Sequence, residues 1–335
     1  MRAVSNVESL FSVINESAQI IQNELDCPYI EAVAETGENL FNGEVVQESI
    51  SELSKKKLNN LYQSVRLSRC QNEEIRKAFQ LAALKGLKES SLPMHQMTPD
   101  SVGIFIGYLF QRFFQERSKL TILDPAVGTG NLLSCVLNQL LEKQIQSIGI
   151  DIDDLLIKIA YVNANLQEHS VELYNQDSLK NLFVDPVDAV VCDLPVGYYP
   201  DDEWAGNFEL KAEEGHSYAH HLFIEQSIRY TKQGGYLFFL IPDHLFETPE
   251  AKKLHHFLKK HAVIQGLLRL PSSMFKAEEH RKSIFILQKK GEGIVPPKQV
   301  LLADLPRFSN KKALLSVIAK IDNWYAVNKT ETGRR

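Results

Sequence analysis

The sequence predicts an α/β protein in which helices come first and a mostly parallel, doubly wound sheet follows. Residues 1–90 carry apolar side chains at spacings of three and four, the period of helices that bury one face. Beyond residue 100, short apolar runs alternate with helical stretches. Runs that are apolar on both faces are typical of strands buried in a parallel sheet, and their alternation with helices is typical of a doubly wound fold.

The helical part is predicted as an N-terminal domain over residues 1–90. Its first helix has an apolar face from Val7 to Leu25, and similar patterns recur twice before residue 87. The segment 88–100, KESSLPMHQMTPD, interrupts the helical pattern. We therefore place a domain boundary there.

The second domain is predicted over residues 91–295 and contains a seven-stranded sheet. The apolar runs predicted as strands are 120–124, 147–151, 171–174, 187–193, 235–242, 262–270 and 283–289. No clear helix separates the last two runs, and a parallel return needs a crossover of about a dozen residues or more. The last strand is therefore predicted to be antiparallel. Residues 296–335 are predicted to form a helical C-terminal tail.

The composition is typical of a globular protein, with 44% hydrophobic residues. No stretch approaches the roughly 20 consecutive apolar residues of a membrane helix, and the first residues lack the apolar core of a signal peptide. The four cysteines are scattered, without metal-ligand or disulfide spacing. We therefore expect a cytoplasmic protein with no membrane partner. No third ligand accompanies His216 and His220 at a metal-like spacing, so we interpret these histidines as helix-surface or packing residues and expect no metal.

Charge is distributed unevenly along a chain whose formal net charge is −5. Residues 251–312 hold 14 Lys and Arg and four acidic residues, whereas residues 185–217 hold nine acidic residues and one lysine. A basic segment can follow the phosphates of DNA, so residues 251–312 are the candidate DNA contact. A solvated surface gives the same pattern, and the acidic segment opposes a polyanion.

The first predicted strand and the turn after it form the most informative stretch, LTILDPAVGTGNLLSCVLNQLLEK. The strand ends at Asp124, a turn contains Gly128 and Gly130, and an amphipathic helix follows. Glycines let a ligand approach the backbone, and a helix N-terminus offers unpaired N–H groups. Asp151 ends the next strand, 21 residues beyond Gly130, where an acid can accept hydrogen bonds from a ribose. This order predicts a nucleoside-containing ligand.

The residues around this turn favour a ligand without phosphate. The Gly-Lys-Ser/Thr of a P-loop is absent, and Leu133 stands where a dinucleotide site prefers a third glycine. A carboxylate at Asp124 would repel a pyrophosphate and attract a cationic amine. S-adenosylmethionine carries such an amine, a sulfonium and a ribose. An NAD-dependent oxidoreductase is the more distant alternative.

The segment DPAVGTGNLL resembles the cofactor motif of S-adenosylmethionine-dependent DNA adenine-N6 methyltransferases, especially the modification subunits of type I restriction systems. The resemblance covers roughly residues 94–290 and implies a Rossmann-like class I methyltransferase fold with S-adenosyl-L-methionine as cofactor. It also implies that Thr98 and Pro99 open a helix, as N-cap and N1, beside the methionine end of the cofactor. Asp177 would then meet the adenine ring. The cofactor-binding residues implied by the resemblance are Thr98, Pro99, Asp124, Pro125, Ala126, Gly128, Gly130, Asn131, Asp151, Ile152, Asp177 and Ser178.

The segment VVCDLPVGYYP resembles the active-site motif of the same family, in which the fourth strand ends in Asn/Asp-Pro-Pro-aromatic. The resemblance implies that the Asp193 side chain and the Leu194 carbonyl accept hydrogen bonds from the target amine, and that Pro195 stiffens the turn. Val196 replaces the aromatic residue that would stack on a flipped base. Tyr198 is the candidate replacement, with Tyr199 as the alternative.

The leading hypothesis is therefore an N-methyltransferase acting on adenine N6 in DNA. The alternatives are an N-methyltransferase acting on protein glutamine or RNA, and an S-adenosylmethionine-binding subunit or sensor with weakened turnover. About 45 residues follow the last predicted strand, too few for a target-recognition domain. Base specificity would then come from a separate partner or be slight.

Overall fold

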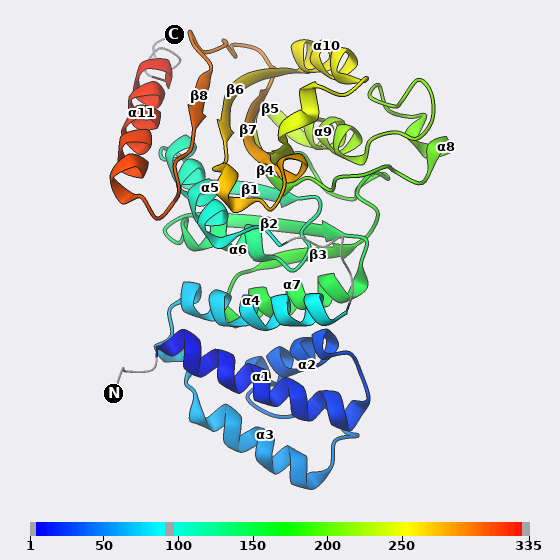
Figure 1. The fold of residues 1–335 in the computed structure, drawn as a ribbon, viewed down its shortest axis with the longest axis vertical. Helices are drawn as coiled ribbons and strands as arrows, with labels where there is room; N and C mark the ends of the chain where they lie inside the picture. The colour runs from blue at the N-terminus through cyan, green and yellow to red at the C-terminus, as the bar shows by residue number, and fades with distance from the viewer. Residues whose placement is uncertain (1–4, 91–96, 330–335) are drawn as a thin grey trace.

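The computed structural model describes residues 5–90 and 97–329. In these residues a single sheet of eight strands forms the centre of the molecule (Figure 1). The strands are β1 (Lys119–Asp124), β2 (Gln144–Asp151), β3 (Val171–Asn175), β4 (Val187–Asp193), β5 (Thr231–Pro242), β6 (Ala262–Arg269), β7 (Lys282–Lys289) and β8 (Leu301–Asp304). Their order across the sheet is β3-β2-β1-β4-β5-β7-β6-β8.

The antiparallel strand predicted from the sequence is β7, which lies between β5 and β6 and is antiparallel to both. The other pairings in the sheet are parallel. Lys282, the first residue of β7, faces Pro242, the last residue of β5. The antiparallel direction thus brings the amino end of β7 to the edge where the parallel strands have their carboxyl ends.

The eighth strand lies in the segment that the sequence analysis expected to be a helical tail. β8 pairs with β6 in parallel, with Gly266 facing Leu301, and only then does the chain enter α11 (Lys311–Lys329). Four residues are too few to show a strand period in the sequence. Pairing with β6, rather than local propensity, defines this strand.

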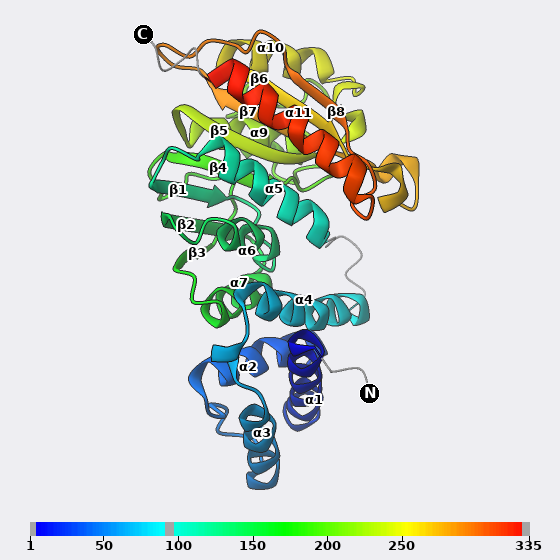
Figure 2. The same cartoon turned by 90° about the vertical axis from the view of Figure 1, so that its left-hand side faces the viewer.

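Helices cover both faces of the sheet. The remaining helices are α1 (Asn6–Leu25), α2 (Tyr29–Asn42), α3 (Glu52–Ser64), α4 (Asn72–Glu89), α5 (Asp100–Phe113), α6 (Asn131–Asn138), α7 (Asp154–Leu166), α8 (Asp202–Ala205), α9 (Ala219–Arg229) and α10 (Ala251–His261). One apolar core joins α5, α6 and α11 to the sheet, and a second joins α9 and α10 to its other face (Figure 2). The rings of Phe110 in α5 and Phe238 in β5 lie 4.3 Å apart in the first core.

The N-terminal helices form a third core that includes one helix of the sheet layer. Helices α1 to α4 bury their apolar faces against one another and against Leu156, Ile159 and Val162 of α7. Gly37 of α2 meets α7 so closely that a Cβ at this position would overlap Val162. Figure 1 shows α4 lying between α1 and α7. The helical bundle is therefore packed directly on the helix that follows β2.

Candidate active site

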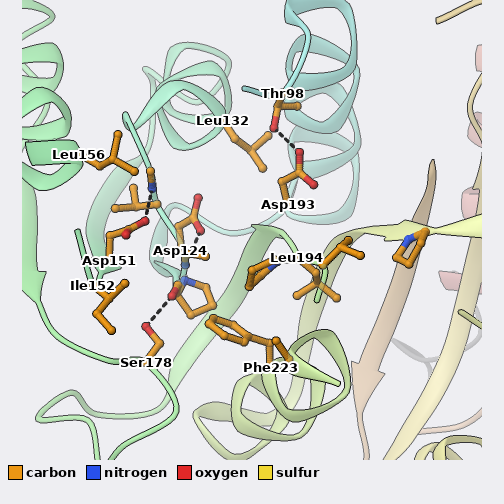
Figure 3. Close-up of a pocket in the computed structure, with 18 of the residues that line it drawn as sticks. Thr98, Asp124, Leu132, Asp151, Ile152, Leu156, Ser178, Asp193, Leu194 and Phe223 are labelled. Atoms are coloured by element: carbon orange, nitrogen blue, oxygen red, sulfur yellow. Dashed lines mark hydrogen bonds between the residues drawn. The ribbon is translucent and has the colours of Figure 1, made fainter. Parts of the chain in front are cut away.

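A cavity of about 760 Å³ opens at the carboxyl edge of the sheet, where the loops after β1, β2, β3 and β4 converge (Figure 3). The site residues predicted from the sequence line this cavity, with the exceptions of Pro99 and Gly130. Residues more than 90 positions apart in the sequence therefore meet at one place. The hydrogen bonds and the exposure of each predicted residue determine which groups of a ligand it can contact.

The turn after β1 brings backbone close to the cavity and starts α6. Gly128 and Gly130 have φ angles of +53° and +75°, which favour glycine. Open space surrounds the position of a Cβ on Gly128, whereas a Cβ on Gly130 would lie 3.3 Å from the Cα of Ala160 in α7. Gly128 therefore leaves room for a ligand. Gly130 instead allows α6 to begin close against α7.

Asp124 lies at the end of β1 and is 1% exposed. Its Oδ1 accepts a hydrogen bond of 3.1 Å from the N–H of Ala126. Burial, together with the negative charges of Asp151 and Asp193, raises the pKa of Asp124 to about 8. Without a cation beside it, this acid is protonated at neutral pH, and a cation placed against it would favour the carboxylate.

Asp151 and Ile152, at the end of β2, present a polar and an apolar group side by side. The N–H of Gly128 donates to Asp151 Oδ2 at 2.8 Å, and the N–H of Asp153 donates to Oδ1 at 3.1 Å. These bonds fix the carboxylate and leave further acceptor positions on both oxygens. The Ile152 side chain is 72% exposed and lines the cavity, as does Phe223 of α9 (Figure 3).

The segment after β3 is fixed by hydrogen bonds from other loops. Ser178 donates its hydroxyl to the carbonyl of Pro125 at 2.5 Å, so this side chain joins two loops of the cavity wall. Asp177 accepts from the hydroxyl of Tyr199 at 2.7 Å and from the N–H of Leu179 at 2.9 Å. Tyr199 is buried, and burial followed by its bond to Asp177 raises the pKa of its hydroxyl. Its ring is therefore not available to stack on a substrate.

Asp193 ends β4 with both carboxylate oxygens engaged. Thr98 donates its hydroxyl to Oδ2 at 2.8 Å, as Figure 3 shows, and Lys282 of β7 lies with its Nζ 2.5 Å from Oδ1. The predicted N-cap role of Thr98 is wrong, because α5 begins after Pro99 and has no side-chain cap. The Thr98 hydroxyl donates to Asp193 instead of capping α5.

The turn after Asp193 carries an exposed pair of aromatic rings. Leu194 is buried and its N–H donates to the carbonyl of Leu240 at 3.1 Å, which ties the turn to β5. Val196 and Tyr198 both line the cavity, and Tyr198 is 62% exposed. The Tyr198 ring stacks on Tyr218 at 5.1 Å and an interplanar angle of 21°. An exposed apolar surface therefore lies beside the position of the missing motif aromatic.

Arg76, which the sequence analysis missed, links the N-terminal helices to the cavity wall. Its side chain is fully buried and donates from Nη1 to Asn131 Oδ1 at 2.5 Å and to Asp100 at 3.0 Å. Asn131 in turn donates to the carbonyl of Thr98 at 3.0 Å. A continuous set of hydrogen bonds thus runs from α4 through Asn131 and Thr98 to Asp193. The burial of Arg76 could not be predicted from the sequence, because a basic residue in an amphipathic helix is ordinarily on the surface.

Replacing Arg76 by methionine is expected to weaken binding of S-adenosylhomocysteine by about tenfold, because Asn131 and Asp100 lose the donor that fixes them. Isothermal titration calorimetry measures this change. Lys77→Met on the same helix is the matched control, since Lys77 contacts Glu73 only at 3.4 Å and is 39% exposed. Equal affinities of the Arg76→Met variant and the wild type would contradict the positioning role.

The basic and acidic segments predicted from the sequence partly neutralise each other. Lys260 of α10 pairs with Glu209 at 3.2 Å, and His261 lies 3.3 Å from the same acid. Basic side chains also reach the cavity itself, where Arg281 and Lys282 form part of the wall. The acidic side of the rim includes Asp201, which also lines the cavity. The rim is therefore mixed in charge.

His216, His220 and the adjacent His221 are divided between surface and core. His216 is exposed and one ring nitrogen lies 2.8 Å from Asp202, whereas His220 and His221 are buried in the first turn of α9. Over residues 5–90 and 97–329, no three His, Cys, Asp or Glu side chains are placed to hold a metal ion. In the same part of the chain, no helix combines the length and the apolar character needed to cross a bilayer.

Comparison with known proteins shows the family to which the chain belongs. Residues 95–331 match the N-6 DNA methylase family, and this match covers the whole sheet and all the residues that line the cavity except Leu87. The chain belongs to the N-6 DNA methylase family. Residues 8–87 match the YtxK N-terminal helical domain, which corresponds to the bundle of α1 to α4.

Two close relatives share nearly the whole length of this N-6 DNA methylase family member. The chain is 54% identical to the YtxK protein of Bacillus subtilis (strain 168), named as uncharacterized, over 97% of this chain and 99% of that protein. A solved structure from Listeria monocytogenes, provisionally named a class I S-adenosylmethionine-dependent methyltransferase, is 50% identical. It has a TM-score of 0.89 and covers 96% of this chain and 99% of its own.

The fold is also that of larger methyltransferase subunits. The methyltransferase subunit of a type I restriction-modification system from Streptococcus thermophilus has a TM-score of 0.61 at 15% identity, covering 97% of this chain and 79% of its own. At this identity the likeness concerns the fold. The predicted class I methyltransferase fold, preceded by helices, is thus confirmed.

Proposed function

We propose that this protein is an S-adenosylmethionine-dependent N-methyltransferase and that its leading target is the N6 amino group of adenine in DNA. The observation that carries the proposal is the position of Asp193. This acid ends β4 and borders the same cavity as Asp124 and Asp151, at the position where the family motif has its amine acceptor.

The residues of the cavity fit the proposed cofactor. The buried acid Asp124 would pair with the ammonium of the methionine part, and Asp151 would accept hydrogen bonds from the ribose hydroxyls. The exposed Ile152 and the ring of Phe223 offer apolar surfaces for a purine, with Asp177 nearby at the same wall. The cavity volume of about 760 Å³ is within the range of small-molecule sites.

The protein's own contribution to the reaction is to orient the target amine. When bound, S-adenosylmethionine supplies an electrophilic methyl group on a sulfonium. The lone pair of an adenine amine is delocalised into the ring, and acceptors on its two N–H bonds favour its localisation. Asp193 and the carbonyl of Leu194 would be these acceptors, and Pro195 restricts the turn that holds them. Most of the acceleration would come from this positioning.

The stacked pair of Tyr198 and Tyr218 is the proposed support for a base. Base–aromatic stacking contributes about 1–3 kcal/mol per base, which compensates for the loss of the motif aromatic at Val196. Tyr198 serves this role better than Tyr199, because Tyr199 is buried and bonded to Asp177. A separate protein that recognises the DNA sequence is the proposed partner, and residues 251–312 supply the basic surface that would face the phosphates.

The second candidate target is the carboxamide of a glutamine side chain in a protein. The acidic side of the rim favours it, because Asp177 and Asp201 line the cavity and would repel phosphates that pass close to them. RNA carries the same phosphate charge as DNA and is favoured less on this ground. The chemistry required of Asp193 and Leu194 is the same for all three targets.

The proposal is tested by following a labelled methyl group. The purified protein is incubated with labelled S-adenosylmethionine and a cell lysate separated into DNA, RNA and protein, and the label in each fraction is measured. Label in DNA that is recovered as N6-methyladenine supports the leading target, and label in protein supports the second. If no fraction gains label, the enzyme proposal fails and a cofactor-binding subunit is the remaining interpretation.

A further inference from the structure

Lys282 is a charged residue of the cavity to which the sequence analysis gave no role. It is the first residue of β7, lines the cavity, and has its Nζ 2.5 Å from Asp193 Oδ1. Both side chains of this ion pair are mostly buried, with exposed fractions of 18% and 16%. Among the residues that the structure describes, Lys282 is the cation that pairs with Asp193.

We infer that Lys282 determines which amines the site accepts, because its charge compensates that of Asp193. The paired acceptor would select an amino group that is uncharged at neutral pH, such as an aromatic amine or a carboxamide, over a protonated alkyl amine. This inference rests on the proposed function and narrows its substrate class.

An unpaired carboxylate at Asp193 would bind cations. A protonated alkyl amine is attracted to a carboxylate, yet it has no lone pair with which to attack a methyl group. It would therefore occupy the site without reacting. Asp124 lies close enough to Asp151 and Asp193 for their negative charges to raise its pKa. A bare Asp193 would make this part of the cavity a binding site for cations.

Asp193 can still accept a hydrogen bond from a substrate amine while it is paired with Lys282. A carboxylate has about four acceptor positions on its two oxygens. Lys282 takes one position on Oδ1, and Thr98 takes one on Oδ2. A position therefore remains on each oxygen for the N–H of a neutral amine, while the net charge of the pair stays near zero.

Asp193 and Lys282 share the cavity wall with other ionisable side chains. The remaining ionisable side chains that line it are Asp177, Asp201, Tyr198, Tyr199, His244, Glu279, His280 and Arg281. Of these, Arg281 pairs with Glu278 at 2.8 Å, and Asp201 pairs with Lys180 at 2.5 Å. The Arg281 guanidinium is thus paired with Glu278, and Lys282 is the basic side chain that contacts Asp193 among the residues that the structure describes.

A purely structural role for Lys282 would also place it here, as a bond between β7 and β4. The two roles differ in their dependence on ligand charge. S-adenosylmethionine and S-adenosylhomocysteine differ at the sulfur, which is a sulfonium in the first and a neutral thioether in the second. Loss of a nearby positive charge should improve binding of the sulfonium selectively, whereas loss of a structural bond should weaken both ligands alike.

The test uses the full chain with Lys282→Met and Lys282→Arg. Calorimetry measures the affinity of each protein for S-adenosylmethionine and for S-adenosylhomocysteine. We expect Lys282→Met to shift the ratio of the two affinities toward the sulfonium by about fivefold, and Lys282→Arg to restore the wild-type ratio. Inhibition of methyl transfer by n-butylammonium should need about tenfold less amine in the methionine variant.

Lys289→Met, at the opposite end of the same strand, is the matched control, and circular dichroism melting establishes that each variant is folded. An unchanged affinity ratio in Lys282→Met, or an arginine variant that behaves like the methionine variant, would overturn the inference. A wild-type protein that binds the cofactor but methylates nothing would refute the proposed function alone, because the affinity ratio still decides the role of Lys282. A wild type that binds neither ligand would overturn both.

Discussion

Replacing Asp193 by alanine is expected to reduce methyl transfer by about a thousandfold, with the affinity for the cofactor changed only a few-fold. The side chain is the acceptor that orients the target amine, and loss of one positioned hydrogen-bonding group in an active site costs about 10²–10³ in rate. The buried environment adds to this effect, because water does not easily replace the missing oxygen. Single-turnover methyl transfer to whichever fraction gains label measures the rate.

The control for this prediction is Asp185→Ala, which removes an exposed acid from the segment before β4. It should leave the rate unchanged. Asp193→Asn keeps one acceptor oxygen and should retain more activity than alanine. Transfer by Asp193→Ala at the wild-type rate would show that the amine is held elsewhere in the cavity.

Cofactor affinity is expected to rise by about tenfold for each pH unit between pH 6 and about 7.5, and to level off near pH 8. Before the cofactor binds, Asp124 holds a proton up to its pKa of about 8. Pairing with the cofactor's ammonium requires the carboxylate, so binding releases this proton at lower pH and becomes more favourable as pH rises. Calorimetry in buffers of different ionisation enthalpy should show nearly one proton released per cofactor at pH 7.

The same pKa predicts how the stability of the protein changes with pH when no cofactor is added. Between about pH 4 and pH 8 the unfolded chain has lost the Asp124 proton and the folded chain retains it, so the free energy of unfolding falls as pH rises. Asp124→Asn removes the titration while keeping an acceptor for the N–H of Ala126. It should bind the cofactor weakly and with little pH dependence. A variant with the wild-type pH profile would place the titration on another group.

The cofactor turn could be predicted from the sequence because its signals are local. Strand, acid, glycine turn and helix follow one another within residues 120–141, and each constrains the backbone over a few positions. The same holds for β4 and the turn that follows Asp193. Alternation of apolar runs with helices was sufficient to predict the parallel strands β1 to β5.

Residues that depend on distant partners were harder to predict. Arg76 and Asn131 are 55 positions apart, and a buried arginine resembles a surface one in an amphipathic helix. β8 is defined by its pairing with β6. Lys282 could have been found, because an antiparallel last strand starts at the edge where the parallel strands end, and its first residue therefore borders the site.

The sequence indicates only in part which aromatic residue could replace the motif aromatic that is missing at Val196. Val196, Tyr198 and Tyr199 are adjacent in the chain, and the sequence offered both tyrosines as replacements. Alternation along the extended backbone sends Tyr199 inward to Asp177 and leaves Tyr198 exposed beside Tyr218. Tyr218 lies 20 residues further along the chain, and the sequence does not indicate that its ring stacks on Tyr198.

The central claim is that the turn between β1 and α6 binds a methionine-derived nucleoside and not a dinucleotide. Titration calorimetry of the purified wild-type protein with S-adenosylhomocysteine tests it most directly, with NAD as the comparison. The account predicts saturable heat at one ligand per chain for S-adenosylhomocysteine and none for NAD. No heat with S-adenosylhomocysteine, or saturable binding of NAD, would contradict it.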